Sequence, residues 1–176
     1  MKPPRPVIVL PYDDTWPASY EEEAGIIAAR LGLSGLSLHH IGSTSVPGLH
    51  AKPVIDMVGE VDHIEQMDDH NPAMVDLGYT PMGEYGLPRR RFFMKDTDGV
   101  RSHHVHMYQR GDPEITRHLV FRDYLRSHLD AAQAYGDLKS KLAAAHPDDM
   151  EAYISGKHDL IQALERKALM WGAQLG

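Results

Sequence analysis

The chain has 176 residues, enough for one domain with a sizeable core, and its formal net charge of -7 predicts no surface for duplex nucleic acid. Hydrophobic residues make up 42%, which favours a globular fold, and the lack of cysteine in the sequence excludes disulfides and thiolate metal sites. We therefore expect a single cytoplasmic domain over residues 1–176, with no signal peptide, no membrane helix and an unassigned oligomeric state.

The predicted elements begin with strands and interleaved helices and end with helices alone. Apolar runs between turn signals predict strands at 7–10, 36–41, 53–61, 79–82, 91–94 and 102–108. Helical periodicity predicts helices at 15–32, at 62–77 with an interruption at Asn71-Pro72, and near 113–128, 130–145 and 149–171. Thr15 and Asp148 are the expected N-caps of the first and last helices. This order predicts an α/β or α+β domain with a mixed sheet flanked by helices and a C-terminal helical segment.

A polar glycine turn joins two of these strands in the stretch HIGSTSVPGLHAKPVIDM. Gly42 lets the backbone approach a ligand closely, while Ser43 and Thr44 offer hydroxyls and backbone amides, so the turn can cradle phosphate oxygens. Lys52 would add a positive charge. The alternative is an ordinary polar loop, since the spacing of a Walker A motif is absent from the sequence.

Asp56 places a single carboxylate in an otherwise apolar strand. Strand alternation puts it on one face with Val54, Val58 and Glu60. A buried carboxylate needs a cation, a metal or strong hydrogen-bond donors. A structural ion pair with Lys52 or an arginine is the alternative to a functional role.

His104 and His106 alternate on one face of the strand at 102–108. With Asp56 they would complete a His-His-carboxylate set for a divalent metal, which suits manganese, iron, nickel or zinc better than magnesium. Glu60 is a weaker candidate for a fourth ligand. The alternative is that His104 binds a backbone group and His106 lies on the surface.

Basic residues fall among apolar positions on the helix near 113–128. At 100° per residue, Arg122 and Arg126 lie between Ile115 and Leu119, with His118 one step to the side. Arginines in an apolar surround mark either an anion-binding cleft or side chains that snorkel or pair with an acid such as Asp123.

Three further basic features carry the same ambiguity. Lys157 projects into the middle of the apolar stripe of the last helix, so its ammonium must snorkel, meet a buried acid or reach a polar cleft. The neighbouring Gly156 indicates a close approach by another segment. Lys139 lies at the edge of an apolar stripe, and the arginines at 89–91 would either contact phosphates or remain solvated in a turn.

The stretch HIGSTSVPGLHAKPVIDM resembles the signature of the GrpB family of bacterial proteins, and RSHHVHMY, RHLVFRDYLRSH, AYGDLKSKLA and AYISGKHDLI resemble its later blocks in order. The resemblance implies a nucleotidyltransferase-like fold related to DNA polymerase beta, with Gly42 and Ser43 as the phosphate turn and Asp56 as a metal-binding acid. It also tilts the interpretation of His118, Arg122 and Lys157 toward a phosphate-binding role. The sequence departs from the superfamily pattern, because Val54 and Val58 stand where a second acid would flank Asp56.

The resemblance and the residues together predict a nucleotidyltransferase or nucleotide-binding protein, with a nucleotide or phosphorylated small molecule as ligand and magnesium, manganese or a transition metal as cofactor. Ser43, Thr44 and Lys52 would hold the phosphates, Arg122 and Lys157 would neutralise them, and an acceptor would attack the α-phosphate. A metal-dependent hydrolase using Asp56, His104 and His106 is one alternative. A non-catalytic nucleotide- or coenzyme-binding module is another, because relatives occur fused to dephospho-coenzyme A kinase.

Overall fold

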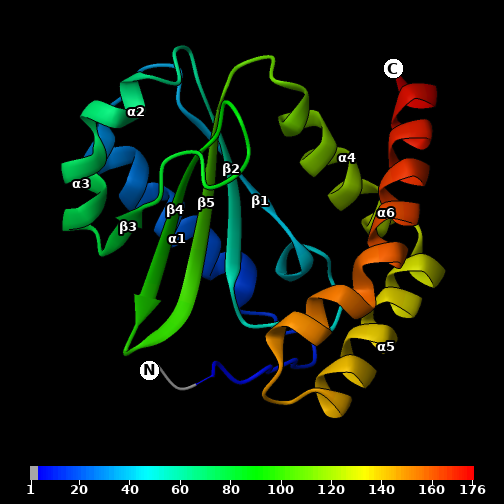
Figure 1. Cartoon of the computed structure of the whole chain (residues 1–176). Helices are drawn as coiled ribbons and strands as arrows, with labels where there is room; N and C mark the ends of the chain where they lie inside the picture. Colours follow the sequence, from blue (N-terminus) through cyan, green and yellow to red (C-terminus); the bar gives the residue numbers. More distant parts are fainter. Residues whose placement is uncertain (1–3) are drawn as a thin grey trace.

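A five-stranded mixed sheet in the order β1-β2-β5-β4-β3 forms the centre of the computed structural model, which describes residues 4–176 (Figure 1). Strands β2 and β5 are parallel, and the other neighbouring strands are antiparallel. The mixed sheet expected from the sequence is therefore confirmed. The strands are β1 Ser37–Ile41, β2 Ile55–Val61, β3 Tyr79–Pro81, β4 Arg91–Thr97 and β5 Val100–Gln109.

The helices form two groups on either side of this sheet, with α4, α5 and α6 gathered together on one side and α1, α2 and α3 on the other (Figure 1). The C-terminal group confirms the predicted helical segment, and α6 runs from Met150 to Leu175. The helices are α1 Trp16–Leu31, α2 Gln66–Asp69, α3 Asn71–Asp76, α4 Pro113–Ser127, α5 Leu129–Ala145 and α6, with a short 3-10 turn, η1, at Ser43–Ser45.

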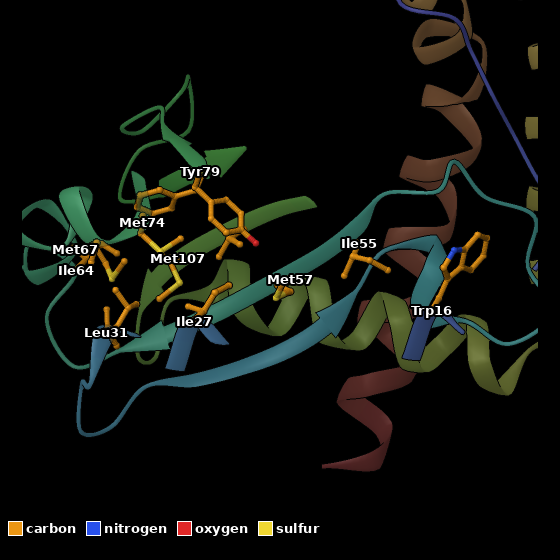
Figure 2. Close-up of a cluster of buried hydrophobic side chains, with 14 of the residues drawn as sticks. Trp16, Ile27, Leu31, Ile55, Met57, Ile64, Met67, Met74, Tyr79 and Met107 are labelled. Carbon is orange, nitrogen blue, oxygen red and sulfur yellow. The ribbon is translucent and has the colours of Figure 1, made fainter. Parts of the chain in front are cut away.

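Strand β2 supplies side chains to both faces of the sheet. Ile55 and Met57 pack into a core against α1 and the α2–α3 segment, which Figure 2 shows in close-up. Val58 instead packs on the opposite face with Ile115 of α4. The alternation read from the sequence is therefore real, and it directs Asp56 toward the C-terminal helices.

Several predicted boundaries are wrong in detail. Residues 7–10 make only an isolated bridge, between Leu10 and Ala51, because the surrounding prolines cannot continue a ladder. Asp149 rather than Asp148 caps α6, because its side chain accepts a hydrogen bond from the backbone amide of Ala152. Thr15 precedes α1 without a capping side chain, since its hydroxyl donates to Asp13.

The interruption expected at Asn71-Pro72 in the segment 62–77 is confirmed, because this segment forms two short helices, α2 and α3, that meet at His70. Among residues 4–176, helices with the length and hydropathy of a membrane span are absent.

Candidate phosphate-binding site

A pocket of about 200 Å³ lies between the end of β1, the start of β2 and the C-terminal helices. Asp56 and His104 reach it from the sheet, and α5 and α6 each supply a tyrosine and a lysine. Its lining is Gly42, Ser43, Thr44, Lys52, Val54, Asp56, His104, Phe121, Tyr135, Lys139, Tyr153 and Lys157. Most of the residues predicted to bind phosphate therefore meet in one place.

Gly42 brings the turn and the carboxylate together. It has φ 72° and ψ -174°, a conformation found essentially only in glycine. A Cβ at this position would lie 2.7 Å from Asp56 Oδ2, and the register that pairs Ile41 with Asp56 explains this proximity. The turn needs glycine because the Asp56 carboxylate rests against its backbone.

The hydroxyls after Gly42 have different tasks. The Thr44 side chain is buried, donates to the Val54 carbonyl and accepts from His40 Nε2 at 2.9 Å, so it fastens the turn. Ser45 donates to the Gly42 carbonyl across the same turn. Ser43 Oγ faces the pocket, where it accepts a hydrogen bond from Lys139 Nζ at 2.7 Å.

Lys139 is the most deeply buried cation of the pocket, with only 2% of its surface exposed. Its ammonium lies over the Tyr135 ring, 4.4 Å from the centroid, in addition to its bond to Ser43. Burial, together with the charges of Lys157 and Lys52, lowers its pKa to about 7. Lys139 is therefore held in place by neutral partners that leave its charge uncompensated.

Lys52 and Lys157 share the other tyrosine. Their ammonium groups lie 5.4 and 4.7 Å from the centroid of the Tyr153 ring, and Lys52 also contacts Met150 Sδ at 3.8 Å. Burial lowers the pKa of Lys157 to about 8 and lowers that of Lys52 as well. Within the described part of the chain, none of the three pocket lysines forms an ion pair with a carboxylate.

Asp56 is the acidic residue in the pocket lining. Together, the three lysines and this one aspartate give the pocket a formal net charge of +2. Its Oδ1 lies 3.0 Å from His104 Nδ1 and 3.9 Å from His106 Nε2. Burial favours the protonated acid, but the bonds from His104 and His106 outweigh it and hold the pKa of Asp56 below its usual range. The alternative interpretation, a structural ion pair of Asp56 with Lys52 or an arginine, does not hold among the described residues, because the histidines are the partners of Asp56.

Each of these histidines also contacts an arginine, through the ring nitrogen that faces away from Asp56. Arg101 Nη1 lies 3.0 Å from His104 Nε2, and Arg90 Nη1 lies 3.2 Å from His106 Nδ1. An arginine can only donate, so both of these ring nitrogens accept, and the proton of each neutral ring lies on the nitrogen that faces Asp56.

The expected metal set does not fit this donor pattern. A metal ligand must direct a lone pair at the ion, whereas both imidazoles direct N–H groups toward Asp56. Among residues 4–176, a group of three or more histidine, aspartate or glutamate side chains suited to hold a metal ion is absent. His104 acts here as a hydrogen-bond donor to the carboxylate, and the N–H group of His106 faces the same oxygen from 3.9 Å.

Two residues predicted to bind phosphate lie away from the pocket lining. Arg122 pairs with Asp123 at 2.8 Å and donates to the His40 carbonyl, so it fastens α4 to β1. The His118 ring packs against His106, and burial lowers its pKa to about 3. Arg126 likewise binds the Ser45 carbonyl. These basic residues on the apolar side of α4 anchor backbone and neighbouring rings.

Sequence reasoning missed the aromatic and arginine partners of the site. Tyr135 and Tyr153 have the spacing of core residues, so only their proximity to lysines on the same helices signals a role. Arg90 points inward and contacts His106, whereas its neighbour Arg91 pairs with Asp68. Arg101 follows a hairpin turn and has no distinguishing pattern.

A second, wider groove of about 680 Å³ lies near the opposite end of β5 and includes Arg89, Arg91 and Arg110. Each of these arginines is paired with acids: Arg89 with Asp112, Arg91 with Asp68, and Arg110 with Glu60 and Asp62. Its positive charge is therefore neutralised within the chain, unlike that of the smaller pocket. For this reason we place the candidate site in the smaller pocket.

Known proteins share this fold. The crystal structure of GrpB from Enterococcus faecalis superimposes with a TM-score of 0.88 at 43% identity, covering 93% of this chain and 98% of that one. The crystal structure of Cid1 poly(U) polymerase with Mg 3'-dATP bound covers 84% of this chain and 49% of its own, with a TM-score of 0.55 at 9% identity. This second likeness shows a nucleotidyltransferase-like fold and nothing more.

Proteins of similar sequence include two UPF0157 proteins and a dephospho-CoA kinase. UPF0157 protein YqkA of Bacillus subtilis is 45% identical over 169 residues, which cover 96% of this chain and 49% of YqkA, so the chain spans about half of that relative. UPF0157 protein PA4798 of Pseudomonas aeruginosa is 38% identical over 92% of this chain and 67% of its own length. A dephospho-CoA kinase of Mycolicibacterium paratuberculosis is 25% identical over 97% of this chain and 48% of its own. The family model described as GrpB protein matches residues 6–167, and the chain belongs to the GrpB family.

Proposed function

We propose that this protein binds a nucleotide or a related phosphorylated small molecule by its phosphates, in the pocket between the Gly42–Thr44 turn and helices α5 and α6. The observation that carries the proposal is the set of three lysine ammonium groups that converge there without a carboxylate partner. Buried ammonium groups are costly to leave uncompensated, and a phosphate group would supply the missing negative charge.

The roles follow from the contacts. Lys139 and Ser43 already form a hydrogen-bonded pair, so a phosphate oxygen entering the pocket can accept from both. Lys157 and Lys52 would bind further phosphate oxygens from above the Tyr153 ring. The flanking aromatic rings fix the ammonium groups without neutralising them, which keeps their charge available to the ligand.

Nucleotidyl transfer is the reaction that we propose for this site. The lysines would stabilise the charge that develops on the phosphates as an acceptor attacks the α-phosphorus and pyrophosphate leaves. Asp56, held ionised by its histidines, would accept a hydrogen bond from the acceptor and orient it, and the proton that the acceptor loses on attack would pass to solvent. The solved structures of Cid1 with Mg 3'-dATP and MgGTP bound, which share the fold, support nucleotides as the ligand class to test first.

Calorimetric titration with ATP tests binding. Lys139→Met should weaken the affinity at least tenfold, since a hydrogen bond to a charged group contributes about 1.5–3 kcal/mol. Lys141→Met is the matched control, because Lys141 is exposed on the same helix and should leave the affinity unchanged. Saturable binding that is the same in wild type and Lys139→Met would refute the proposal, as would the absence of binding to any nucleotide or coenzyme tested.

A pyrophosphate-release assay with candidate hydroxyl and amine acceptors tests the reaction. Release that Asp56→Asn abolishes, while ATP affinity is kept, would support transfer. Nucleotide binding without release from any acceptor would favour the alternative of a binding module.

A further inference from the structure

Two arginine–histidine pairs support the Asp56 carboxylate. The first runs from Arg101 through His104, with nitrogen–nitrogen and nitrogen–oxygen distances that are both 3.0 Å. The second runs from Arg90 through His106, with 3.2 Å between the nitrogens and 3.9 Å to the same Asp56 oxygen. Both pairs therefore end at Oδ1 of Asp56.

The arginines determine which nitrogen of each ring carries the proton. A guanidinium has no acceptor, so His104 must accept at Nε2 and His106 at Nδ1. A neutral imidazole has one donor and one acceptor, which leaves Nδ1–H of His104 and Nε2–H of His106 directed at Asp56.

Metal ligation by these histidines would require the reverse arrangement. A metal-bound histidine turns its lone pair to the metal and donates its other N–H to an acceptor. Here the other nitrogen of each ring faces an arginine, so moving the proton there would set two donors against each other. The rings are built to donate to Asp56, and this makes them positioning residues.

The lysines hold positive charge where a metal would otherwise be needed. Lys52, Lys139 and Lys157 come from three separate segments of the chain, and tyrosine rings rather than acids fix their positions. Ammonium groups that lack a carboxylate partner can neutralise phosphate oxygens directly.

We propose that the site binds the phosphates of its ligand without a divalent metal, with the three lysines supplying the positive charge, with His104 fixing Asp56 as a hydrogen-bond donor and with the N–H group of His106 facing the same oxygen. The inference rests on the proposed function, because it concerns the same pocket. The ligand class that it names is a metal-free di- or triphosphate.

The first test is calorimetric titration with sodium pyrophosphate, once in EDTA and once with excess magnesium or manganese. We expect saturable binding in EDTA with an affinity equal to or higher than that measured with the metal, since the metal competes for the free anion. Binding only in the presence of metal would overturn this inference while leaving the proposed function standing. Binding in neither condition would overturn both.

The second test needs no ligand. Long-range proton–nitrogen NMR at pH 8, where ordinary histidines are neutral, reports the tautomer of each ring. His104 should be protonated at Nδ1 and His106 at Nε2, with each signal assigned from its loss in His104→Asn and His106→Gln. The opposite tautomer at either residue would overturn the inference.

The same two variants also distinguish a histidine that donates a hydrogen bond from one that binds a metal. Asparagine retains an N–H group near the place of Nδ1, and glutamine retains one near the place of Nε2, whereas their amides are poor ligands for transition metals. Both variants should bind pyrophosphate within about threefold of wild type. Loss of binding in both amide variants would show that the imidazoles are needed as ligands and would contradict the proposal.

Discussion

Gly42 shows at the scale of one residue how the turn and the acid depend on each other. Its φ is positive, and a Cβ there would press on Asp56 Oδ2, so glycine is required on two independent grounds. Gly48 in the same loop also has a positive φ, but nothing lies within 4 Å of the place of its Cβ.

We therefore expect Gly42→Ala to destabilise the protein by more than Gly48→Ala, which should cost about 1–2 kcal/mol for its backbone alone. Urea denaturation of the two variants measures the difference, which reports the contact with Asp56 together with the unusual backbone conformation of Gly42. Equal losses would show that the carboxylate does not rest against the turn.

The pocket lysines predict how ligand affinity depends on pH. Burial lowers the pKa of Lys157 to about 8 and that of Lys139 to about 7, so both ammonium groups lose protons as the pH rises through these values. The terminal phosphate of ATP is fully ionised above about pH 7.5. The affinity for ATP should therefore fall at least tenfold between about pH 7.5 and 9.5, and the fall should be shallower in Lys157→Met, where Lys139 is the one of these two lysines that still titrates.

Stability without ligand should change in the opposite direction. Over the interval between the lowered pKa of Lys139, about 7, and its ordinary value of 10.5, the unfolded chain binds more protons than the folded one. The contribution of Lys139 to the free energy of unfolding therefore becomes more favourable as the pH rises above about 7. Lys139→Met should remove this gain, and urea denaturation at several pH values checks it. An unchanged pH slope in Lys139→Met would contradict the burial of an uncompensated ammonium.

At the scale of elements, the packing of α5 against α6 aligns the two lysines that these helices carry. Gly156 makes this possible, because a Cβ there would collide with the Leu142 side chain of α5. The close approach expected at Gly156 is thus confirmed. Gly25 is also within a helix, α1, but is exposed, with nothing within 4 Å of the place of its Cβ.

Alanine should therefore act with opposite sign at these two glycines. Gly25→Ala should stabilise the protein by about 0.5–1 kcal/mol through helix propensity, whereas overpacking in Gly156→Ala should destabilise it by about 1–3 kcal/mol. Chemical denaturation gives both values. A stabilising Gly156→Ala would mean that α5 and α6 are not in close contact at this position.

At the scale of the whole molecule, the pocket lies between the sheet and the C-terminal helices. One core fills the space between the sheet and α1–α3, and the other joins α4, α5 and α6. Asp56 and His104 come from the sheet, and Lys139 and Lys157 come from the helical half. The site therefore depends on how the two halves pack, although each half has its own apolar core.

This arrangement explains what the sequence could predict. Local periodicity was sufficient for the five strands of the sheet, though not for residues 7–10, and for the C-terminal helices and the face on which Asp56 lies, because each of these depends on neighbouring residues. It could not separate Lys139, which reaches the pocket, from Arg122, which binds the His40 carbonyl, since both lie beside apolar residues on a helix. That difference depends on contacts between residues far apart in the chain.

The histidines illustrate the same limit. Alternation correctly placed His104 and His106 near Asp56. Their chemistry depends on Arg101 and Arg90, which approach the opposite sides of the rings. Whether a histidine donates a hydrogen bond or binds a metal depends on the partner of its other ring nitrogen. Sequence spacing does not reveal that partner.

A crystal structure of the protein grown with ATP tests the central claim most directly. The account predicts phosphate oxygens within hydrogen-bond distance of Lys139 Nζ, Lys157 Nζ and Ser43 Oγ, next to the Gly42 turn. Phosphates bound instead in the wider groove at Arg89 and Arg110, or a nucleotide that leaves the three pocket lysines without contact, would contradict it.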